Sequence, residues 1–150
     1  MLLRRATIED AQLLLSWRND PETRLQSKST EEISVEDHIQ WLTKLLKNSQ
    51  IKLYIGEVNQ IPVGTVRSNR DRDGTLELSW TVAPIHRGKG LGKIMVMQFV
   101  QKLHPRQKFI ARIRKGNISS ENIAKALGLQ EDMSEVLKDN GDKHPFTLWR

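Results

Sequence analysis

The sequence predicts an α+β fold in which a mostly antiparallel sheet of about seven strands is flanked by about four helices. Stretches with apolar residues at every second position are typical of strands, and turn signals such as Asn59-Gln60 and Asp73-Gly74 join them as hairpins. Segments with apolar residues three and four positions apart indicate amphipathic helices between these groups of strands. A chain of 150 residues without a repeat or linker is expected to form a single domain, residues 1–150.

The first half of the chain is predicted to contain a strand, two helices and a hairpin. Thr7, followed three residues later by Asp10, is typical of a capping box that opens the first helix, and Asp20-Pro21 predicts its end. Ser34 is expected to cap the second helix. The predicted elements are a strand at 2–8, a helix through Trp17, a helix whose apolar stripe is Val35, Ile39, Leu42 and Leu46, and strands at 51–58 and 62–68.

The second half alternates strands and helices before ending in two strands. Thr75–Val82 places Leu76, Leu78, Trp80 and Val82 on a core face and leaves Glu77, Ser79 and Thr81 on a polar face. Asn140-Gly141 is a turn signal between the last two strands. The remaining predicted elements are a helix after Gly90, a strand at 108–114, a helix at 119–127 that Gly128 closes, and strands at 130–138 and 145–149.

The segment from Thr81 to Gly92 carries the clearest functional signal. A predicted strand stops before Pro84, the run Arg-Gly-Lys-Gly-Leu-Gly occupies 87–92, and apolar residues then recur at helical spacing. The glycines therefore lie at a helix N-terminus, where free N–H groups and the helix dipole attract anions and where a phosphate can approach the main chain. Formal charge is added there by Arg87, Lys89 and Lys93.

Two better-known phosphate motifs do not fit this segment. A P-loop requires Ser or Thr after Gly-Lys, and here Gly92-Lys93 is followed by Ile94. A dinucleotide-binding fingerprint requires a third glycine at position 93, which is lysine. The anion site is therefore of another type.

Composition narrows the possible partners. The net charge of +6 implies an anionic partner, but the chain has no nucleic-acid motif and no aromatic residues interleaved with its basic ones, so no nucleic acid is expected. Without cysteine there is neither a disulfide nor a cysteine nucleophile, and the four histidines are too far apart for a local metal motif. No apolar run is long enough for a signal peptide or a membrane span, so a cytoplasmic protein without membrane contact is expected.

The pattern Arg87-x-x-Gly90-x-Gly92 after a strand resembles the acyl-CoA pyrophosphate loop of the GNAT N-acetyltransferases. A second group, made up of Asn117, Ser120, Leu127, Gly128 and Leu129, matches another motif of this family at the correct separation. The resemblance covers nearly the whole chain and implies a sheet with a central V-shaped splay that receives acetyl-CoA and releases CoA. The cofactor-binding residues that it implies are Thr81, Val82, Arg87, Gly88, Lys89, Gly90, Leu91, Gly92, Lys93, Asn117 and Ser120.

The candidate catalytic residues are Glu77 and Ser120. Glu77 lies on the polar face of the strand that leads into the loop, where a carboxylate could deprotonate an alkylammonium of pKa about 10; alternatively it forms an exposed ion pair with an arginine of the hairpin. Many family members carry a tyrosine at the position of Ala124 that protonates the departing thiolate, so the candidate proton donors here are Ser120, Ser119 and water, and Ala124 also keeps a catalytically silent module open. The Val82 N–H is expected to hold the oxyanion of the tetrahedral intermediate.

The acceptor is expected to contact the segment that precedes the first hairpin. This segment resembles GNAT enzymes that acetylate nucleotide-linked 4-amino sugars in pseudaminic-acid pathways, and also the ribosomal-protein N-terminal acetyltransferases. The candidate acceptor-binding residues are Trp17, Arg18, Asn19, His38, Trp41 and Arg67. Arg18 and Arg24 could bind a diphosphate and a tryptophan could stack on a base or sugar; the alternatives are packing roles for Trp17, His38 and Trp41 and a capping role for Asn117.

Three function classes are consistent with these features. The first is an acetyl-CoA-dependent enzyme that acetylates a small amine by direct attack in a ternary complex, with a nucleotide-linked amino sugar preferred. The second is a protein N-terminal or lysine acetyltransferase, and the third is a catalytically silent acyl-CoA-binding module. A monomer or a homodimer is expected.

Overall fold

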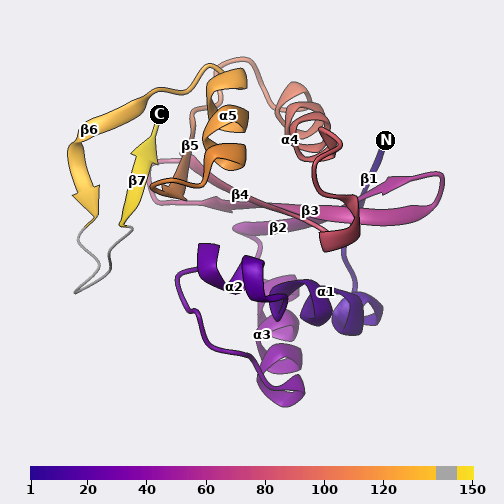
Figure 1. The fold of residues 1–150 in the computed structure, drawn as a ribbon. Coiled ribbons are helices and arrows are strands. Elements are labelled where there is room, and N and C mark those ends of the chain that lie inside the picture. The colour runs from indigo at the N-terminus through magenta and orange to yellow at the C-terminus, as the bar shows by residue number, and fades with distance from the viewer. Residues whose placement is uncertain (138–144) are drawn as a thin grey trace.

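The computed structural model describes residues 1–137 and 145–150, which form a seven-stranded sheet with helices on both faces (Figure 1). The strands are β1 (Leu2–Arg5), β2 (Ile51–Val58), β3 (Ile61–Arg70), β4 (Leu76–Val82), β5 (Phe109–Arg114), β6 (Glu131–Leu137) and β7 (Phe146–Trp149). They lie in the order β1-β2-β3-β4-β5-β7-β6, and β4 and β5 are the parallel pair among otherwise antiparallel neighbours. The predicted fold class is thereby confirmed.

The helices are divided between the two faces of the sheet (Figure 1). One face is covered by α1 (Ala11–Arg18), α2 (Pro21–Gln26) and α3 (Val35–Lys47), and the other by α4 (Leu91–Gln101) and α5 (Ile118–Ala126). Two short 3-10 turns, η1 (Ile8–Asp10) and η2 (Pro84–His86), precede α1 and the glycine loop. The buried residues form three clusters: one with Val66, Leu78, Met95 and Val96 beside α4, one with Ala111, Ile113 and Ala124 beside α5, and one with Leu14, Trp17, Leu42, Leu53 and Ile55 beside α1 and α3.

One helix was not predicted from the sequence. Asp20-Pro21 does end α1, which stops at Arg18, but the same pair also begins α2. The Asp20 carboxylate accepts a hydrogen bond from the Thr23 N–H at 3.1 Å, and Pro21 occupies the first helical position, where a backbone N–H would have no partner anyway. The described residues therefore contain five α-helices instead of about four.

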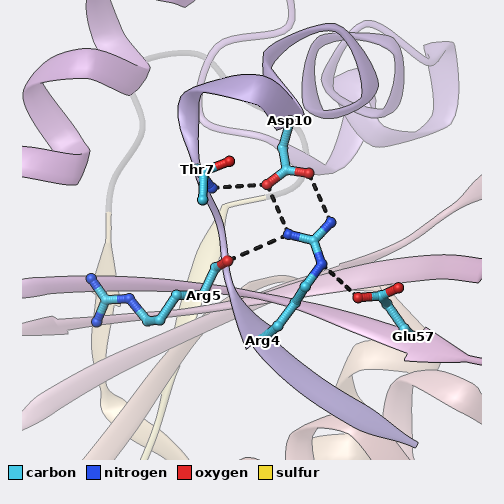
Figure 2. Close-up of polar contacts among 5 residues, drawn as sticks. All are labelled: Arg4, Arg5, Thr7, Asp10 and Glu57. Carbon is cyan, nitrogen blue, oxygen red and sulfur yellow. Dashed lines mark hydrogen bonds and ion pairs between the residues drawn. The ribbon is translucent and has the colours of Figure 1, made fainter. Parts of the chain in front are cut away.

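The first strand is shorter than predicted because an ion-pair cluster turns the chain after Arg5 (Figure 2). The Arg4 guanidinium donates to both oxygens of Asp10 at 2.8 and 2.9 Å and to Glu57 of β2 at 2.5 Å. Asp10 in turn accepts from the Thr7 N–H at 2.8 Å, which is the second bond of the predicted capping box. The cluster thus fixes the start of η1 against the edge of the sheet.

The hairpin turns agree with their sequence signals where they are described. Asn59 and Gln60 adopt left-handed φ values of 49° and 67°, as expected for the two central residues of a tight hairpin, and β2 and β3 pair on either side of them. The turn predicted at Asn140-Gly141 lies outside the described residues.

The sheet splays between β4 and β5. Their ladder consists of three pairs, from Leu76–Phe109 to Leu78–Ala111, after which β4 continues to Val82 while β5 pairs with β7. The Ala83 N–H donates to Val63 of β3 at 2.8 Å, and successive N–H groups of a strand point to opposite edges, so the Val82 N–H faces the splay. The free edge of β4 and the glycine loop that follows it therefore border the same opening.

Candidate functional site

A cleft of about 920 Å³ runs along the splay and brings together most of the predicted site residues. Its lining combines side chains of α1, α2 and α3 with the end of β4, the glycine loop and the first turn of α5. The predicted residues that line it are Trp17, Arg18, His38, Trp41, Arg67, Glu77, Thr81, Val82, Arg87, Gly88, Gly90, Leu91, Gly92, Lys93, Asn117 and Ser120. Asn19 and Lys89 are the two that do not.

The glycine loop ends in a helix N-terminus without a side-chain cap. Gly90 is the N-cap of α4 with a left-handed φ of 74°, and the first backbone bond that returns to it comes from Ile94 at 3.3 Å. The N–H groups of Leu91, Gly92 and Lys93 thus have no acceptor within the helix. A Cβ built on Gly90 would meet no atom within 4 Å, so the approach to these N–H groups is open. This arrangement suits an anion.

Gly92 has a different role from Gly90. A Cβ on Gly92 would lie 2.9 Å from Cγ2 of Val82 and 3.1 Å from Cδ1 of Ile123. The absence of a side chain therefore lets the first turn of α4 pack directly between the end of β4 and α5. Gly90 thus leaves room for a ligand, whereas Gly92 lets the walls of the cleft pack closely.

Arg87 forms ion pairs and a hydrogen bond with residues at the start of α2. Its guanidinium pairs with Asp20 at 3.0 Å and Glu22 at 2.7 Å, and it donates to the Thr23 hydroxyl at 2.7 Å. Burial raises the pKa of Asp20, but the hydrogen bonds from the Thr23 N–H and from Arg87 outweigh this effect and lower it. Arg87 therefore joins the glycine loop to the wall of the cleft that α2 forms.

Glu77 points into the cleft from the polar face of β4. Its carboxylate pairs at 2.7 Å with Arg112 of β5, and not with Arg67 or Arg72 of the hairpin. Both side chains are about 30% exposed, at 30% and 28% respectively, so solvent and a ligand can reach the pair. Sequence reasoning missed Arg112, although its alternation with Ala111 and Ile113 along the predicted strand already placed it on the polar face.

Ser120 is held from two sides on the first turn of α5. Its N–H donates to the Asn117 side chain at 3.3 Å, so Asn117 caps α5, and its hydroxyl oxygen accepts from the Trp80 indole N–H at 3.2 Å. Ala124, at the position of the expected tyrosine, is fully buried against Ala111 and does not line the cleft.

The candidate acceptor residues divide into packing and exposed groups. Trp17 is 7% exposed and belongs to the core under α1, whereas Trp41 is 44% exposed, with its ring centroid 5.5 Å from that of His38. Burial lowers the pKa of His38, and the charge of Arg18 adds to this effect. Asn19 exchanges two hydrogen bonds of 2.8 Å with the Ile33 backbone, so it fixes the segment before α3.

Arg18 and Arg67 give this part of the cleft its charge. Arg18 donates to the Ser29 carbonyl at 2.8 Å, and its Nη1 is buried without a hydrogen-bond partner among the described residues. Burial, followed by the charge of Arg24, lowers the pKa of Arg18. Within residues 1–137 and 145–150, neither Arg18 nor Arg67 forms an ion pair with a carboxylate. In this part of the chain, two positive charges of the cleft wall thus have no protein counter-ion.

Other kinds of site have no candidate among the described residues. No three His, Asp or Glu side chains of this part of the chain gather closely enough to hold a metal ion. No helix in residues 1–137 and 145–150 combines the length and the apolar character needed to cross a membrane.

Comparisons with known proteins agree with this geometry. A family model described as an acetyltransferase (GNAT) domain matches residues 1–130. No curated protein sequence matches the chain.

Three solved structures illustrate the likeness of the fold. A ribosomal-protein-alanine N-acetyltransferase from Brucella melitensis is 24% identical with a TM-score of 0.80, over 99% of this chain and 98% of that one. The putative acetyltransferase yncA from Salmonella typhimurium, solved with its cofactor acetyl-CoA, is 21% identical with a TM-score of 0.75, over 99% and 91%. A spermidine N-acetyltransferase from Vibrio cholerae, in complex with CoA and spermine, is 15% identical with a TM-score of 0.82, over 99% and 92%.

Proposed function

Because the chain belongs to the GNAT acetyltransferase family, we propose that residues 1–150 form one domain that transfers the acetyl group of acetyl-CoA to the primary amine of a small acceptor. The observation that carries the proposal is one cleft that joins the uncapped N-terminus of α4, the free edge of β4 and the carboxylate of Glu77. An acyl-CoA has an anionic diphosphate and a hydrogen-bonding pantetheine arm, which suit the first two features.

The residues of the loop fit a diphosphate. The N–H groups at the start of α4 bind it, and the open space at Gly88 and Gly90 lets it approach them. Lys93 lies on the same turn and adds a positive charge. The free edge of β4 at Val82 offers backbone hydrogen bonds to the pantetheine arm, and the Val82 N–H holds the oxyanion that forms on the thioester carbonyl.

In the proposed transfer, Glu77 acts as the general base and Ser120 as the general acid. The acceptor nitrogen must be neutral before it attacks, so Glu77 removes its proton directly or through water. Glu77 passes this first proton to water. The neutral amine then bonds to the carbonyl carbon, the carbon–sulfur bond breaks with its electron pair on sulfur, and the attached nitrogen loses its second proton through Glu77 to water. Ser120 donates the proton that the sulfur receives. Holding the amine beside the thioester supplies a further part of the rate enhancement.

The preferred acceptor is a nucleotide-linked amino sugar. Arg18 and Arg67, which lack a carboxylate partner among the described residues, favour an acceptor that carries phosphate, since a guanidinium pairs well with phosphate oxygens. The same charges oppose a polycationic acceptor. The half-exposed Trp41 offers a face on which a base or a sugar can stack.

Thiol release from acetyl-CoA, measured with a panel of acceptors, tests the proposal. The panel contains a UDP-linked 4-amino sugar, the same amino sugar without phosphate, spermidine, and peptides with free N-termini. Turnover that is fastest with the UDP-linked sugar supports both the activity and the acceptor class. Turnover with peptides alone identifies a protein acetyltransferase. Binding of acetyl-CoA without thiol release under any acceptor identifies a silent acyl-CoA-binding module.

A further inference from the structure

The contact between Trp80 and Ser120 joins two walls of the cleft. Trp80 lies on β4 beyond the last ladder pair with β5, so its strand is free on that edge, and Ser120 lies on the first turn of α5. The indole N–H of Trp80 donates to Oγ of Ser120 at 3.2 Å, and both residues line the cleft. Trp80 is partly buried and packs against the core, as its apolar face predicted, and at this point the core face of β4 also borders the cleft.

The direction of this hydrogen bond determines where the serine proton can go. An indole N–H is a donor only, so Oγ of Ser120 must be the acceptor and its own O–H must point elsewhere. No acceptor among the described residues takes that O–H. The backbone of Ser120 is fixed as well, because its N–H donates to Asn117 at 3.3 Å. The hydroxyl proton is therefore left available to a group in the cleft.

The bond also changes the chemistry of the hydroxyl. A hydrogen bond donated to an oxygen stabilises the negative charge that grows on it as its proton leaves, so the hydroxyl becomes a better proton donor. Ala124 cannot supply a donor at this site, since it has no polar side-chain atom and is buried against β5.

We propose that Trp80 is a positioning residue that orients and polarises the Ser120 hydroxyl toward the departing sulfur of acetyl-CoA, an inference that rests on the proposed acetyl transfer. In the step, the amine nitrogen bonds to the carbonyl carbon and the carbon–sulfur bond breaks, with its electron pair on sulfur. The amine proton leaves through Glu77 to water. The sulfur receives the Ser120 proton, and the serine oxygen recovers one from water.

Five variants test this role in the full-length protein: Ser120→Ala, Trp80→Phe, the double variant of these two, Ser119→Ala for the neighbouring hydroxyl, and Trp149→Phe as a control. Trp149→Phe removes a comparable indole hydrogen bond, from Trp149 to the Thr147 hydroxyl at 3.1 Å, but both of these residues are buried and neither lines the cleft. Steady-state thiol release with the best acceptor of the panel gives kcat, and calorimetry gives the Kd of acetyl-CoA for each variant.

Ser120→Ala is expected to lower kcat about 10²-fold, as loss of a general acid does. Trp80→Phe is expected to lower it about tenfold, the effect of one hydrogen bond. Trp80→Phe should leave the Kd of acetyl-CoA within about twofold. In the double variant, kcat should equal that of Ser120→Ala, because Trp80 acts only through the serine. Trp149→Phe should lower the melting temperature and leave kcat unchanged.

Several outcomes overturn the inference. An unchanged kcat in Trp80→Phe, a loss that persists in the Ser120→Ala background, or a raised Kd of acetyl-CoA would show that Trp80 acts only in packing. A fall of kcat in Ser119→Ala with none in Ser120→Ala would move the donor to the neighbouring hydroxyl. Absence of thiol release in the unmodified protein with every acceptor removes the proposed function, and the inference with it, whereas turnover that is insensitive to both substitutions removes the inference alone.

Discussion

Replacing Glu77 by glutamine separates its proposed role as a base from its visible role in an ion pair. The change keeps the size of the side chain and removes its charge and its ability to take a proton. The pair with Arg112 spans 2.7 Å, but both side chains are more than a quarter exposed, so its loss should cost at most about 1 kcal/mol of unfolding free energy. In a chain of this size, that corresponds to roughly 2–4 °C in melting temperature.

Loss of a general base has a larger effect than loss of this ion pair. We expect Glu77→Gln to lower kcat by roughly 10²–10⁴-fold, which corresponds to about 3–5 kcal/mol of activation free energy. The Kd of acetyl-CoA should change little, because Glu77 is the second residue of β4 and the glycine loop follows the other end of that strand. Thiol-release kinetics, calorimetry and thermal unfolding measure the three quantities.

Arg112→Gln is the matched control for this experiment. It breaks the same ion pair from the other side but leaves the carboxylate in place, so it should reproduce the small loss of stability with at most a several-fold change in kcat. Equal losses of kcat in the two variants would mean that the ion pair shapes the site and that Glu77 is not the base. Full activity of Glu77→Gln would refute the assignment outright.

Three other substitutions test the loop, the ion-pair cluster and the acceptor wall. Gly90→Val should raise the Kd of acetyl-CoA about tenfold or more by calorimetry, because φ is 74° and the side chain would fill the open approach to the N–H groups; retained affinity would contradict the loop assignment. Burial alone would raise the pKa of Asp10, but the hydrogen bond from Arg4 outweighs it and lowers this pKa below its ordinary 3.8. The ionised Asp10 carboxylate therefore stabilises the folded protein above about pH 4, and this contribution is lost as the pH falls through the pKa of Asp10 in the folded state. Asp10→Asn should therefore cost about 2–3 kcal/mol in urea unfolding at pH 7 and less at pH 3; a difference that does not vary with pH would refute this reasoning. Arg18→Gln should raise the KM of a phosphate-bearing acceptor about tenfold and leave that of its phosphate-free analogue unchanged, and equal effects on both would remove Arg18 from phosphate recognition.

The parts of the fold that could be predicted are those whose signals are local. The Asn59-Gln60 turn, the alternation along β4 and the glycines before α4 each specify a backbone conformation within a few residues, and the structure contains all three. The sequence around Asp20-Pro21 was harder to interpret because the pair both ends one helix and begins another.

The parts of the site that could not be predicted depend on contacts between elements distant in sequence. Glu77 was placed correctly on the polar face, but its partner is Arg112, and that pairing follows from the parallel neighbour that β4 acquires. Alternation likewise assigned Trp80 to a core face. It does not reveal that the ladder with β5 stops at Leu78, and this end of the ladder is what brings Trp80 to the cleft and to Ser120.

Arg87 shows why evidence for the phosphate site should come from the main chain of the loop. The guanidinium belongs to the loop by sequence, but its contacts are with Asp20, Glu22 and Thr23 at the start of α2. Because α2 buries no side chain, its position depends on polar contacts such as these. An Arg87 variant would therefore disturb both halves of the cleft, and a loss of acetyl-CoA affinity would not identify a contact with phosphate. Gly90→Val changes only the glycine loop, through its backbone at φ 74° and through the approach to the N–H groups, and does not remove the contacts of Arg87 with α2; it is therefore the sharper test of the proposed diphosphate site.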